Sequence, residues 1–317
     1  MKDIQLRASS TNEISLLDPR DLVPVWIAHL ELRVKAQEIS ADTVVGYRRG
    51  AMKFIDWLNG NPTPDAIRRW KAALLESGDK PSAVNAWMAG VKSFFKWLAE
   101  TNQIPFDPAS LIEGASRRGT KKRHTRQSLT NNEVIRLLEV PDRTTKRGKR
   151  DHAILITMLY TAARGIEMHR ADVEDLRTEH GKLVLAIQGK GHAEKDDILV
   201  LPHDAETAVR DWLAERGTDK GPLFTSLSRR SMKQRLSRRA LRMIVKKCMA
   251  LAGIYGKDKT THSLRHTAIT SAIRNHVPAE KVRGMSRHAS LDTLMIYFHE
   301  TDRIDDPAEE YISYKDG

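Results

Sequence analysis

The sequence predicts a mainly α-helical protein of two domains with a small β-sheet in the second domain, an α+β fold. Three observations support this prediction. The chain has 317 residues, more than one hydrophobic core usually supports. Apolar residues recur with helical spacing four times between residues 20 and 103, and this spacing returns after residue 204. Between these regions, residues 183–187 and 197–201 form two short runs rich in β-forming side chains.

The first domain is expected at residues 20–103, after an N-terminal extension of residues 1–19. Its third helix should begin at Thr63 and Pro64, because a threonine caps a helix well and a proline suits the first helical turn. Five of the six tryptophans fall in this domain, on the apolar stripes of its helices. We therefore interpret these tryptophans as core residues rather than as rings that stack on nucleobases.

Residues 104–127 are expected to link the two domains, because prolines, a glycine and a run of cations replace the helical spacing there. The basic residues of this linker are Arg117, Arg118, Lys121, Lys122 and Arg123. The whole chain carries a formal net charge of +12, which favours a polyanionic partner such as nucleic acid. A run of like charge is often only a solvated segment, but we interpret this one as a strap across a DNA backbone.

The second domain is expected at residues 128–300, followed by a tail of residues 301–317. A capping-box pattern from Thr130 to Glu133 precedes an apolar run, which predicts the start of a helix. The next helix, from residue 152 to about residue 163, is apolar almost all round and should be buried.

The two β-rich runs should form a hairpin whose turn holds a lysine between two glycines. Helices are then expected at about residues 204–216 and 232–252, with three shorter ones between residues 262 and 300. A basic segment without any acidic residue overlaps the second of these helices. Its cations are Arg229, Arg230, Lys233, Arg235, Arg238, Arg239, Arg242, Lys246 and Lys247. A surface that serves solubility usually mixes both signs, so we predict that this segment contacts DNA phosphates.

The composition excludes several classes of protein. Cys248 is the only cysteine, so neither an internal disulfide nor a cysteine zinc cluster can form. The first residues lack an apolar leader segment, and no stretch approaches the ~18 apolar residues of a membrane span. We therefore expect a protein of the reducing cytoplasm that has no contact with a membrane.

Two pairs of polar residues in the second domain stand three residues apart. Arg164 and Glu167 would lie on one side of a helical turn, and His262 and Arg265 would project from one face of another helix. Taken alone, the first pair is equally consistent with an ordinary surface ion pair. Two converging guanidinium groups would suit a phosphate, because these planar forks stay protonated and match its nonbridging oxygens.

His288 precedes Tyr297 by nine residues near the end of this domain. Nine residues of straight helix turn by ~180°, so we expect a break between the two side chains, with Ser290 as the cap. Taken alone, the tyrosine and the histidine would each be interpreted as core residues. The lysine of the hairpin turn alone would be an exposed residue, and Lys182 and Lys195 stand close to it in the sequence.

Together, these residues resemble in order and spacing the catalytic residues of the tyrosine recombinase (phage integrase) family, in its simple two-domain type. The resemblance covers residues 128–300 as the catalytic domain, and the helical domain before it resembles the family's core-binding domain. The implied site consists of Arg164, Lys190, His262, Arg265, His288 and Tyr297, with Glu167 behind them. By this resemblance the two arginines would hold the scissile phosphate, Tyr297 would attack it, and Lys190 would protonate the departing 5′-oxygen.

Two stretches depart from the family pattern. Thr161-Ala162-Ala163 stands where the family commonly has threonine, glycine and a variable residue before the first arginine. Ser286-Arg287 stands where it commonly has leucine and glycine before the second histidine. These departures concern the local backbone and leave the chemical residues in place.

The resemblance implies a site-specific recombinase that cleaves and rejoins duplex DNA through a covalent 3′-phosphotyrosine, in integration, excision or resolution. It implies as partners double-stranded DNA at a specific recombination site, further copies of the chain in a tetramer on that DNA, and accessory proteins that set the direction. A phosphotyrosine keeps the energy of the phosphodiester, so we expect no nucleotide, metal or other cofactor. The tail would dock on a neighbouring protomer, and the protein would be prokaryotic and associated with the nucleoid.

Two other functions stay open at this point. A type IB topoisomerase would use the same chemistry, although nothing in the sequence resembles its larger clamp. A DNA-binding regulator or architectural protein would keep the fold without the chemistry, and its sequence would lack one or more of the six residues. All six are present, which favours the recombinase.

Overall fold

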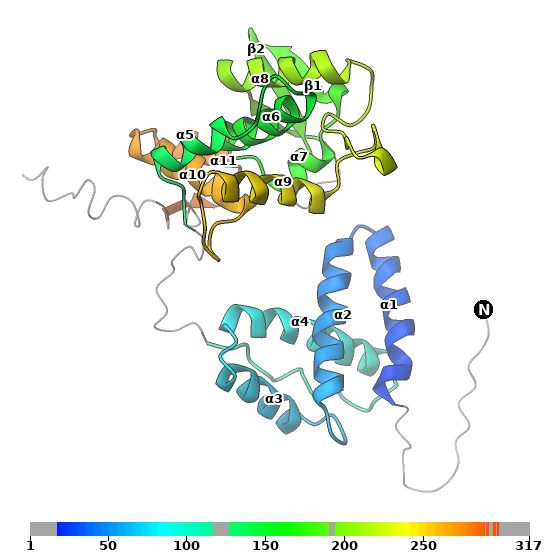
Figure 1. Ribbon diagram of the computed structural model, residues 1–317. Coiled ribbons are helices and arrows are strands. Elements are labelled where there is room, and N and C mark those ends of the chain that lie inside the picture. The colour runs from blue at the N-terminus through cyan, green and yellow to red at the C-terminus, as the bar shows by residue number, and fades with distance from the viewer. Residues whose placement is uncertain are drawn as a thin grey trace, which may run out of the picture. The chain divides into compact units, whose positions relative to one another are not determined.

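The computed structural model describes residues 18–116, 127–189 and 194–288, together with residues 290, 291, 294, 295 and 297. The chain divides into two compact units, residues 1–120 and 121–317. Within the described residues the protein is mostly helical with one three-stranded sheet, which confirms the predicted fold class (Figure 1). The basic residues of the expected linker lie outside the described residues.

Residues 18–116 form a helical bundle around one buried apolar core. Its helices are α1 (Pro19–Lys35), α2 (Ala41–Trp57), α3 (Pro64–Glu76) and α4 (Pro81–Glu100), which confirms the four expected helices. Side-chain oxygens of Asp18, Ser40 and Thr63 cap the N-termini of α1, α2 and α3. Helix α2 packs along α4 and lies beside α1, as Figure 1 shows.

Helices α2 and α4 approach each other so closely that only glycine fits at their crossing. A β-carbon on Gly50 would lie 2.3 Å from the carbonyl oxygen of Trp87, and one on Gly90 would lie 2.2 Å from that of Tyr47. Atoms that are not bonded cannot approach so closely, so any larger residue would push the two helices apart.

Three of the tryptophans in this unit, Trp26, Trp70 and Trp97, are buried as predicted, and Trp87 is partly buried. The prediction is wrong for Trp57, which is 43% exposed. This residue is the last of α2, and its ring stacks on that of the core residue Phe54. Helical spacing alone does not reveal where a neighbouring helix stops.

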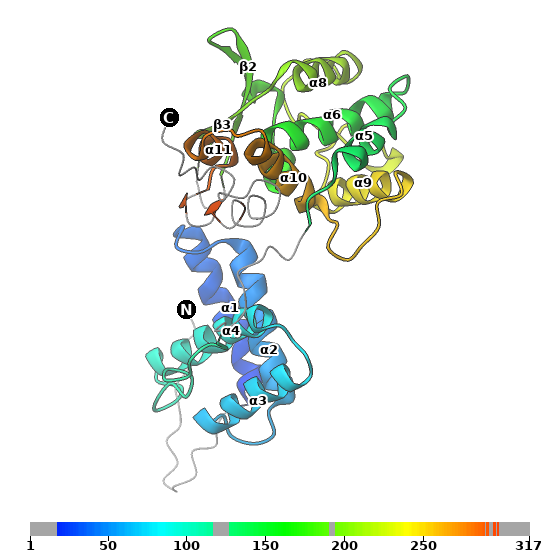
Figure 2. The same ribbon diagram turned by 90° about the vertical axis from the view of Figure 1, so that its left-hand side faces the viewer.

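The second unit contains the other described elements. They are α5 (Asn131–Glu139), α6 (Lys146–Thr161), α7 (Gly165–Arg170), η1 (Val173–Asp175), β1 (Leu176–Glu179), β2 (Lys182–Ile187), β3 (Asp197–Val200), α8 (His203–Arg216), η2 (Arg229–Ser231), α9 (Arg238–Leu251), α10 (Thr261–Arg274) and α11 (Ala279–Ser286). Helix α5 starts with the predicted capping box of Thr130 and Glu133. Helix α6 is buried along most of its length, as predicted, and lies between α8 and α10 (Figure 2).

The three strands form an antiparallel sheet in the order β1-β2-β3. Strands β2 and β3 confirm the predicted hairpin, with Leu185 opposite Leu199. Strand β1 was not expected, because its four residues contain a single apolar side chain. Its turn into β2 is made by His180 and Gly181, which have φ angles of 47° and 73°. Two consecutive positive φ angles are typical of a tight hairpin turn.

The predicted start of α9 is wrong, because the helix begins at Arg238 and not near residue 232. Lys233 has a φ angle of 64°, and Arg235 takes part in an antiparallel bridge. Neither conformation belongs to a helix, and the hydroxyl of Ser237 caps α9 instead.

Helices α10 and α11 confirm two of the three shorter helices expected near the end of the second domain. The third is expected where the described residues 291, 294, 295 and 297 have helical backbone. Among all described residues, no helix is both long enough and apolar enough to cross a membrane.

Candidate active site

Arg164 lies at a sharp turn between α6 and α7. Helix α6 ends at Thr161, its C-cap residue Ala162 has a left-handed backbone with a φ angle of 53°, and Arg164 is the extended N-cap residue of α7. Ala162 occupies the position where the family that this sequence resembles commonly has glycine. The alanine therefore keeps a turn that suits glycine, at a cost of about 1 kcal/mol.

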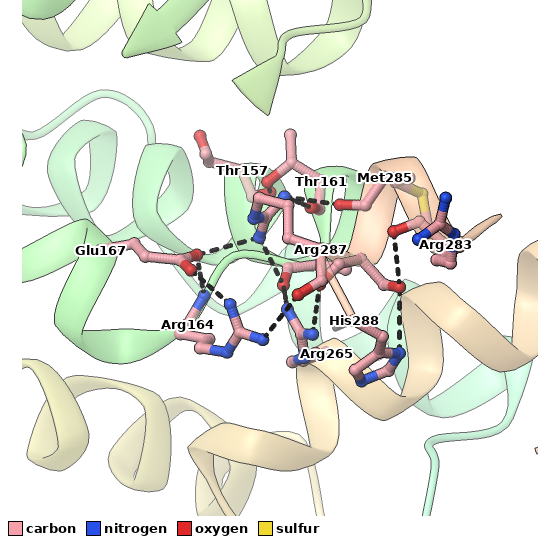
Figure 3. A network of polar contacts seen from close by, with 11 residues as sticks. Thr157, Thr161, Arg164, Glu167, Arg265, Arg283, Met285, Arg287 and His288 are labelled. Carbon is pink, nitrogen blue, oxygen red and sulfur yellow. Dashed lines mark hydrogen bonds and ion pairs between the residues drawn. The ribbon is translucent and has the colours of Figure 1, made fainter. Parts of the chain in front are cut away.

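Glu167 is fully buried next to this turn. Its carboxylate accepts hydrogen bonds from the backbone N–H of Arg164 at 2.7 Å, from Nη1 of Arg164 at 2.8 Å and from Nη2 of Arg287 at 2.9 Å (Figure 3). One buried carboxylate thus holds two guanidinium groups. The pair of Arg164 and Glu167 is therefore not the ordinary surface ion pair that the sequence alone allowed.

Arg265 reaches the same place from α10 and is only 1% exposed. Its Nη1 donates to the carbonyl of Ala162 at 2.6 Å, and its Nη2 donates to the carbonyl of Ser286 at the end of α11. Similarly, Nη2 of Arg164 donates to the carbonyl of Arg287 at 3.2 Å. Carbonyls at the end of a helix lack helical partners, so these two arginines satisfy them and are fixed by them.

Positive charge accumulates in this pocket. The guanidinium groups of Arg164, Arg265 and Arg287 lie around the buried carboxylate of Glu167. Burial, together with the charges of Arg164 and Arg287, lowers the pKa of Arg265 to about 9. The guanidinium still carries its charge at neutral pH. An anion such as a phosphodiester would offset the excess charge, so the pocket is suited to bind one.

A chain of aromatic rings lies beside the arginines. The ring centres of His262 and His266, one turn apart on α10, are 4.9 Å apart, and the ring of His266 is 5.2 Å from that of Tyr297. The ring of His288 is 6.0 Å from that of Tyr297, and its Nδ1 lies 3.1 Å from Oγ of Ser286. Two imidazoles, those of His266 and His288, thus lie close to one phenol, and His262 adjoins the first of them, an arrangement that suits proton transfer from the phenol.

The predicted break between His288 and Tyr297 is present. Helix α11 ends at Ser286, Arg287 has a left-handed backbone with a φ angle of 55°, and helical backbone occurs again at Leu291. Like Ala162, Arg287 occupies a position where the family that this sequence resembles commonly has glycine. The break brings both side chains to one place, and Tyr297 is 4% exposed there.

Several predicted residues cannot be placed. Lys190 lies outside the described residues, as do the five cations of the expected linker. Lys195, its neighbour in sequence, forms ion pairs with Asp172 and Asp175 and is therefore occupied within the domain. In the part of the chain that the structure describes, no three acidic, histidine or cysteine side chains converge as a metal site.

The cations predicted to contact DNA fall into two kinds. Exposed side chains before and along α9 belong to Arg229, Arg230, Lys233, Arg238, Arg239 and Arg242. Arg235 differs, because its Nη1 donates to the carbonyls of His169 and Ala171 and its Nη2 pairs with Asp172. This arginine holds the segment before α9 against the end of α7. Helix α9 packs on α7, and Arg164 is the N-cap residue of α7. The exposed cations of α9 therefore lie on a helix that contacts the helix of Arg164.

Two residues of the site were not singled out from the sequence. His266 contacts both His262 and Tyr297, and its position four residues after His262, on the same face of α10, was an available signal. Arg287 was recognised only as a departure from the family pattern. Its contacts join segments more than a hundred residues apart, for which the sequence offers no local signal.

Comparisons with known proteins agree with this arrangement. The model of the phage integrase family matches residues 127–303, and that of the phage integrase N-terminal SAM-like domain matches residues 26–102. A tyrosine recombinase of Synechococcus elongatus is 31% identical over 306 residues, which cover 90% of this chain and 93% of the relative. The tyrosine recombinase XerD of Listeria innocua is 27% identical over 285 residues, which cover 86% of this chain and 92% of the relative.

Solved structures share the fold. The site-specific recombinase XerH bound to palindromic difH substrate has a TM-score of 0.66 at 19% identity, covering 89% of this chain and 83% of that one. A lambda integrase tetramer bound to a Holliday junction has a TM-score of 0.61 at 15% identity, covering 86% of this chain and 76% of that one. At such identities the likeness concerns the fold alone.

Proposed function

The chain belongs to the phage integrase family, and from this membership we propose how it works as a site-specific tyrosine recombinase that breaks and rejoins DNA. The hydroxyl of Tyr297 attacks a phosphodiester of duplex DNA, forms a 3′-phosphotyrosine and releases a 5′-hydroxyl. The 5′-hydroxyl of a partner strand then attacks the phosphotyrosine and restores a phosphodiester. Each step exchanges one P–O bond for another, so neither step consumes a nucleotide.

Arg164 and Arg265 bind the nonbridging oxygens of the scissile phosphate. Their mutual proximity, their fixed orientation and the surplus of positive charge around Glu167 support this role. Negative charge grows on the phosphoryl group during the attack, and preorganised donors stabilise it without further rearrangement.

Tyr297 needs a proton acceptor, because a phenol with a pKa of about 10 is ionised in only about one molecule per thousand at neutral pH. The ring of His288 lies beside that of Tyr297, and His262 adjoins the same cluster through His266, which supports a role of His262 and His288 in accepting that proton. Lys190 would protonate the departing 5′-oxygen, a task for which an ammonium group with an adjustable pKa is suited.

Double-stranded DNA at a specific recombination site is the substrate. Four copies of the chain act together on it, a proposal supported by the lambda integrase tetramer whose fold this chain shares. The exposed cations along α9 and the basic linker contact the DNA backbone. Accessory proteins set the direction of the exchange, and the protein acts on the nucleoid in the bacterial cytoplasm.

The observation that carries the proposal is that Arg164 and Arg265 converge near the buried carboxylate of Glu167, and that Tyr297 lies close enough to Arg265 to interact with its charge. The experiment begins with a duplex selected by the protein from a randomised DNA pool. Nicks placed along this duplex let a short fragment leave after cleavage and so trap a covalent adduct. The unchanged protein should form an adduct that survives denaturant, and Tyr297→Phe should bind the duplex without forming one.

The same assay separates the other functions. Binding of the selected duplex without any adduct from the unchanged protein would contradict the enzyme and favour a regulator or architectural protein. Relaxation of arbitrary supercoiled plasmids, without exchange between two copies of the selected sequence, would indicate a type IB topoisomerase.

A further inference from the structure

We propose that Arg287 is a positioning residue that locks the two phosphate-binding arginines to each other. This assignment rests on the proposed function of the pocket. Arg287 stands in the sequence directly before His288, at the left-handed residue that ends α11. Its guanidinium shares one acceptor with Arg164 and a second acceptor with Arg265 (Figure 3).

The acceptor shared with Arg164 is the carboxylate of Glu167. Nη1 of Arg164 donates to one carboxylate oxygen at 2.8 Å, and Nη2 of Arg287 donates to the other at 2.9 Å. With both oxygens engaged, the carboxylate is held from two sides. Arg164 thus binds a fixed partner that cannot rotate toward it or away from it.

The acceptor shared with Arg265 is the carbonyl of Ala162, at the end of α6. Nη1 of Arg265 lies 2.6 Å from this oxygen, and Nη2 of Arg287 lies 3.2 Å from it. Nη1 of Arg287 also donates to the carbonyl of Met285 at 2.5 Å, next to the end of α11. One guanidinium therefore joins the ends of α6 and α11, the two places where Arg265 is anchored.

Arg287 acts through these residues, because its Nη groups donate to the two acceptors that Arg164 and Arg265 also use and to the carbonyl of Met285. The position also has a cost. A left-handed backbone disfavours every residue with a β-carbon, and the buried Nε has no hydrogen-bond partner among the described residues. Glycine would avoid both costs, so the contacts of the guanidinium must outweigh them.

The consequence for the reaction is preorganisation. Two guanidinium groups stabilise charge on the phosphoryl oxygens only if their separation and direction are set before the attack. Removing Arg287 takes away one of the three hydrogen bonds that hold the carboxylate of Glu167 and leaves the two from Arg164. It also leaves the ends of α6 and α11 joined by Arg265 alone among these arginines. Binding of duplex DNA depends on many cations and should hardly change.

The test compares Arg287→Met, Arg287→Lys and Arg287→Gly with the unchanged protein on the nicked selected duplex. The control is Arg283→Met, which removes an exposed arginine from the same helix. We expect the single-turnover rate of adduct formation to fall by about 10- to 100-fold in Arg287→Met, as for partners that orient metal ligands. DNA affinity should stay within about twofold, and Arg283→Met should keep the unchanged rate.

The other two variants separate charge, geometry and backbone. Arg287→Lys keeps a charge but cannot bridge two acceptors, so its rate should lie between those of the methionine variant and the unchanged protein. Arg287→Gly relieves the left-handed backbone but loses the same contacts of the guanidinium, so it should be as slow as Arg287→Met. A glycine variant with the unchanged rate would overturn the proposal.

A substrate with a methylphosphonate at the scissile position distinguishes positioning from a purely structural role. A purely structural role would give the same loss of adduct rate from Arg287→Met on this substrate as on the ordinary one. The methylphosphonate lacks one charged nonbridging oxygen, so one arginine has less charge to stabilise. The loss of rate from Arg287→Met should therefore be smaller on this substrate by about tenfold. Equal losses on both substrates would overturn the positioning role. On the ordinary substrate, two outcomes separate the inference from the proposed function. If the unchanged protein forms no adduct, both the proposed function and this inference are wrong. If the unchanged protein forms the adduct and Arg287→Met forms it at the same rate, only this inference is wrong.

Discussion

The ring of His266 lies against the ring of Tyr297, with 5.2 Å between their centres and 35° between their planes. His266 is itself buried, and His262 contacts it edge-on from the preceding turn of α10. The proposed nucleophile is therefore held by a ring on a helix that also carries Arg265. This contact links the direction of the phenol to the position of the phosphate pocket.

Removing this ring should slow the attack by Tyr297. We expect His266→Ala to lower the single-turnover rate of adduct formation about tenfold. Without the packing of this ring, the phenol of Tyr297 would also adopt orientations from which it cannot attack the phosphate. His266→Phe keeps a ring of similar size and should retain most of the rate if packing is the main contribution. A phenylalanine variant as slow as the alanine variant would instead assign His266 a role in proton transfer.

Glu167 should be essential to the stability of the second unit. Glu167→Ala leaves the partly buried guanidinium of Arg164 and the buried one of Arg287 without their carboxylate, and we expect a loss of about 3–5 kcal/mol in the free energy of unfolding. Chemical denaturation followed by circular dichroism measures this loss. The matched control is Glu280→Ala, which removes an exposed partner of Arg283 and should change stability by no more than about 0.5 kcal/mol. Similar losses in both variants would show that the buried carboxylate is dispensable.

Local sequence patterns predicted most of the helices, because capping and helical spacing depend on neighbouring residues. Thr63 and Thr130 begin helices where expected. Strand β1 was missed because it contains a single apolar side chain. The start of α9 was missed because the segment before it is held by distant residues, as in the contact of Arg235 with Asp172. Trp57 was misplaced for a similar reason, since its exposure depends on where a neighbouring helix ends.

The order and spacing of polar residues predicted which side chains form the candidate site but not how they are held. Glu167 was expected behind the arginines, and the structure adds that it holds two of them. The second one, Arg287, reached the site only because the end of α11 meets the end of α6. A contact between two helix ends is not reflected in the spacing of apolar or polar residues, so the sequence could not predict it.

The crossing of α2 and α4 offers a test within a single helix. Gly50→Ala should destabilise the first unit by about 1–3 kcal/mol, because its β-carbon would collide with the carbonyl of Trp87. Gly46→Ala, one turn earlier on α2 with open space around it, should stabilise by about 0.5–1 kcal/mol. Tryptophan fluorescence during denaturation of the full chain reports mainly on this unit, since five of six tryptophans belong to it. Equal effects of the two substitutions would contradict the close approach.

Cys248 should react slowly in the folded protein. Burial, with a contribution from the charge of Asp151, raises the pKa of its thiol from 9.0 to about 11. The folded state keeps this proton longer than the unfolded state, so the contribution to stability is full below about pH 9 and is lost as the pH rises toward about 11. Alkylation by iodoacetamide should therefore rise with a midpoint near pH 11 in the folded protein and near pH 9 in denaturant. A midpoint near pH 9 in both states would show that the thiol is not shielded.

The most direct test of the account is to identify the residue that carries the DNA. The adduct formed on the nicked selected duplex is digested with nuclease and trypsin, and the peptide that retains a nucleotide is sequenced by mass spectrometry. Trypsin releases residues 288–303 as one peptide, in which Tyr297 is the only tyrosine. We expect the nucleotide on Tyr297. A nucleotide on another tyrosine, such as Tyr255 or Tyr311, would contradict the account.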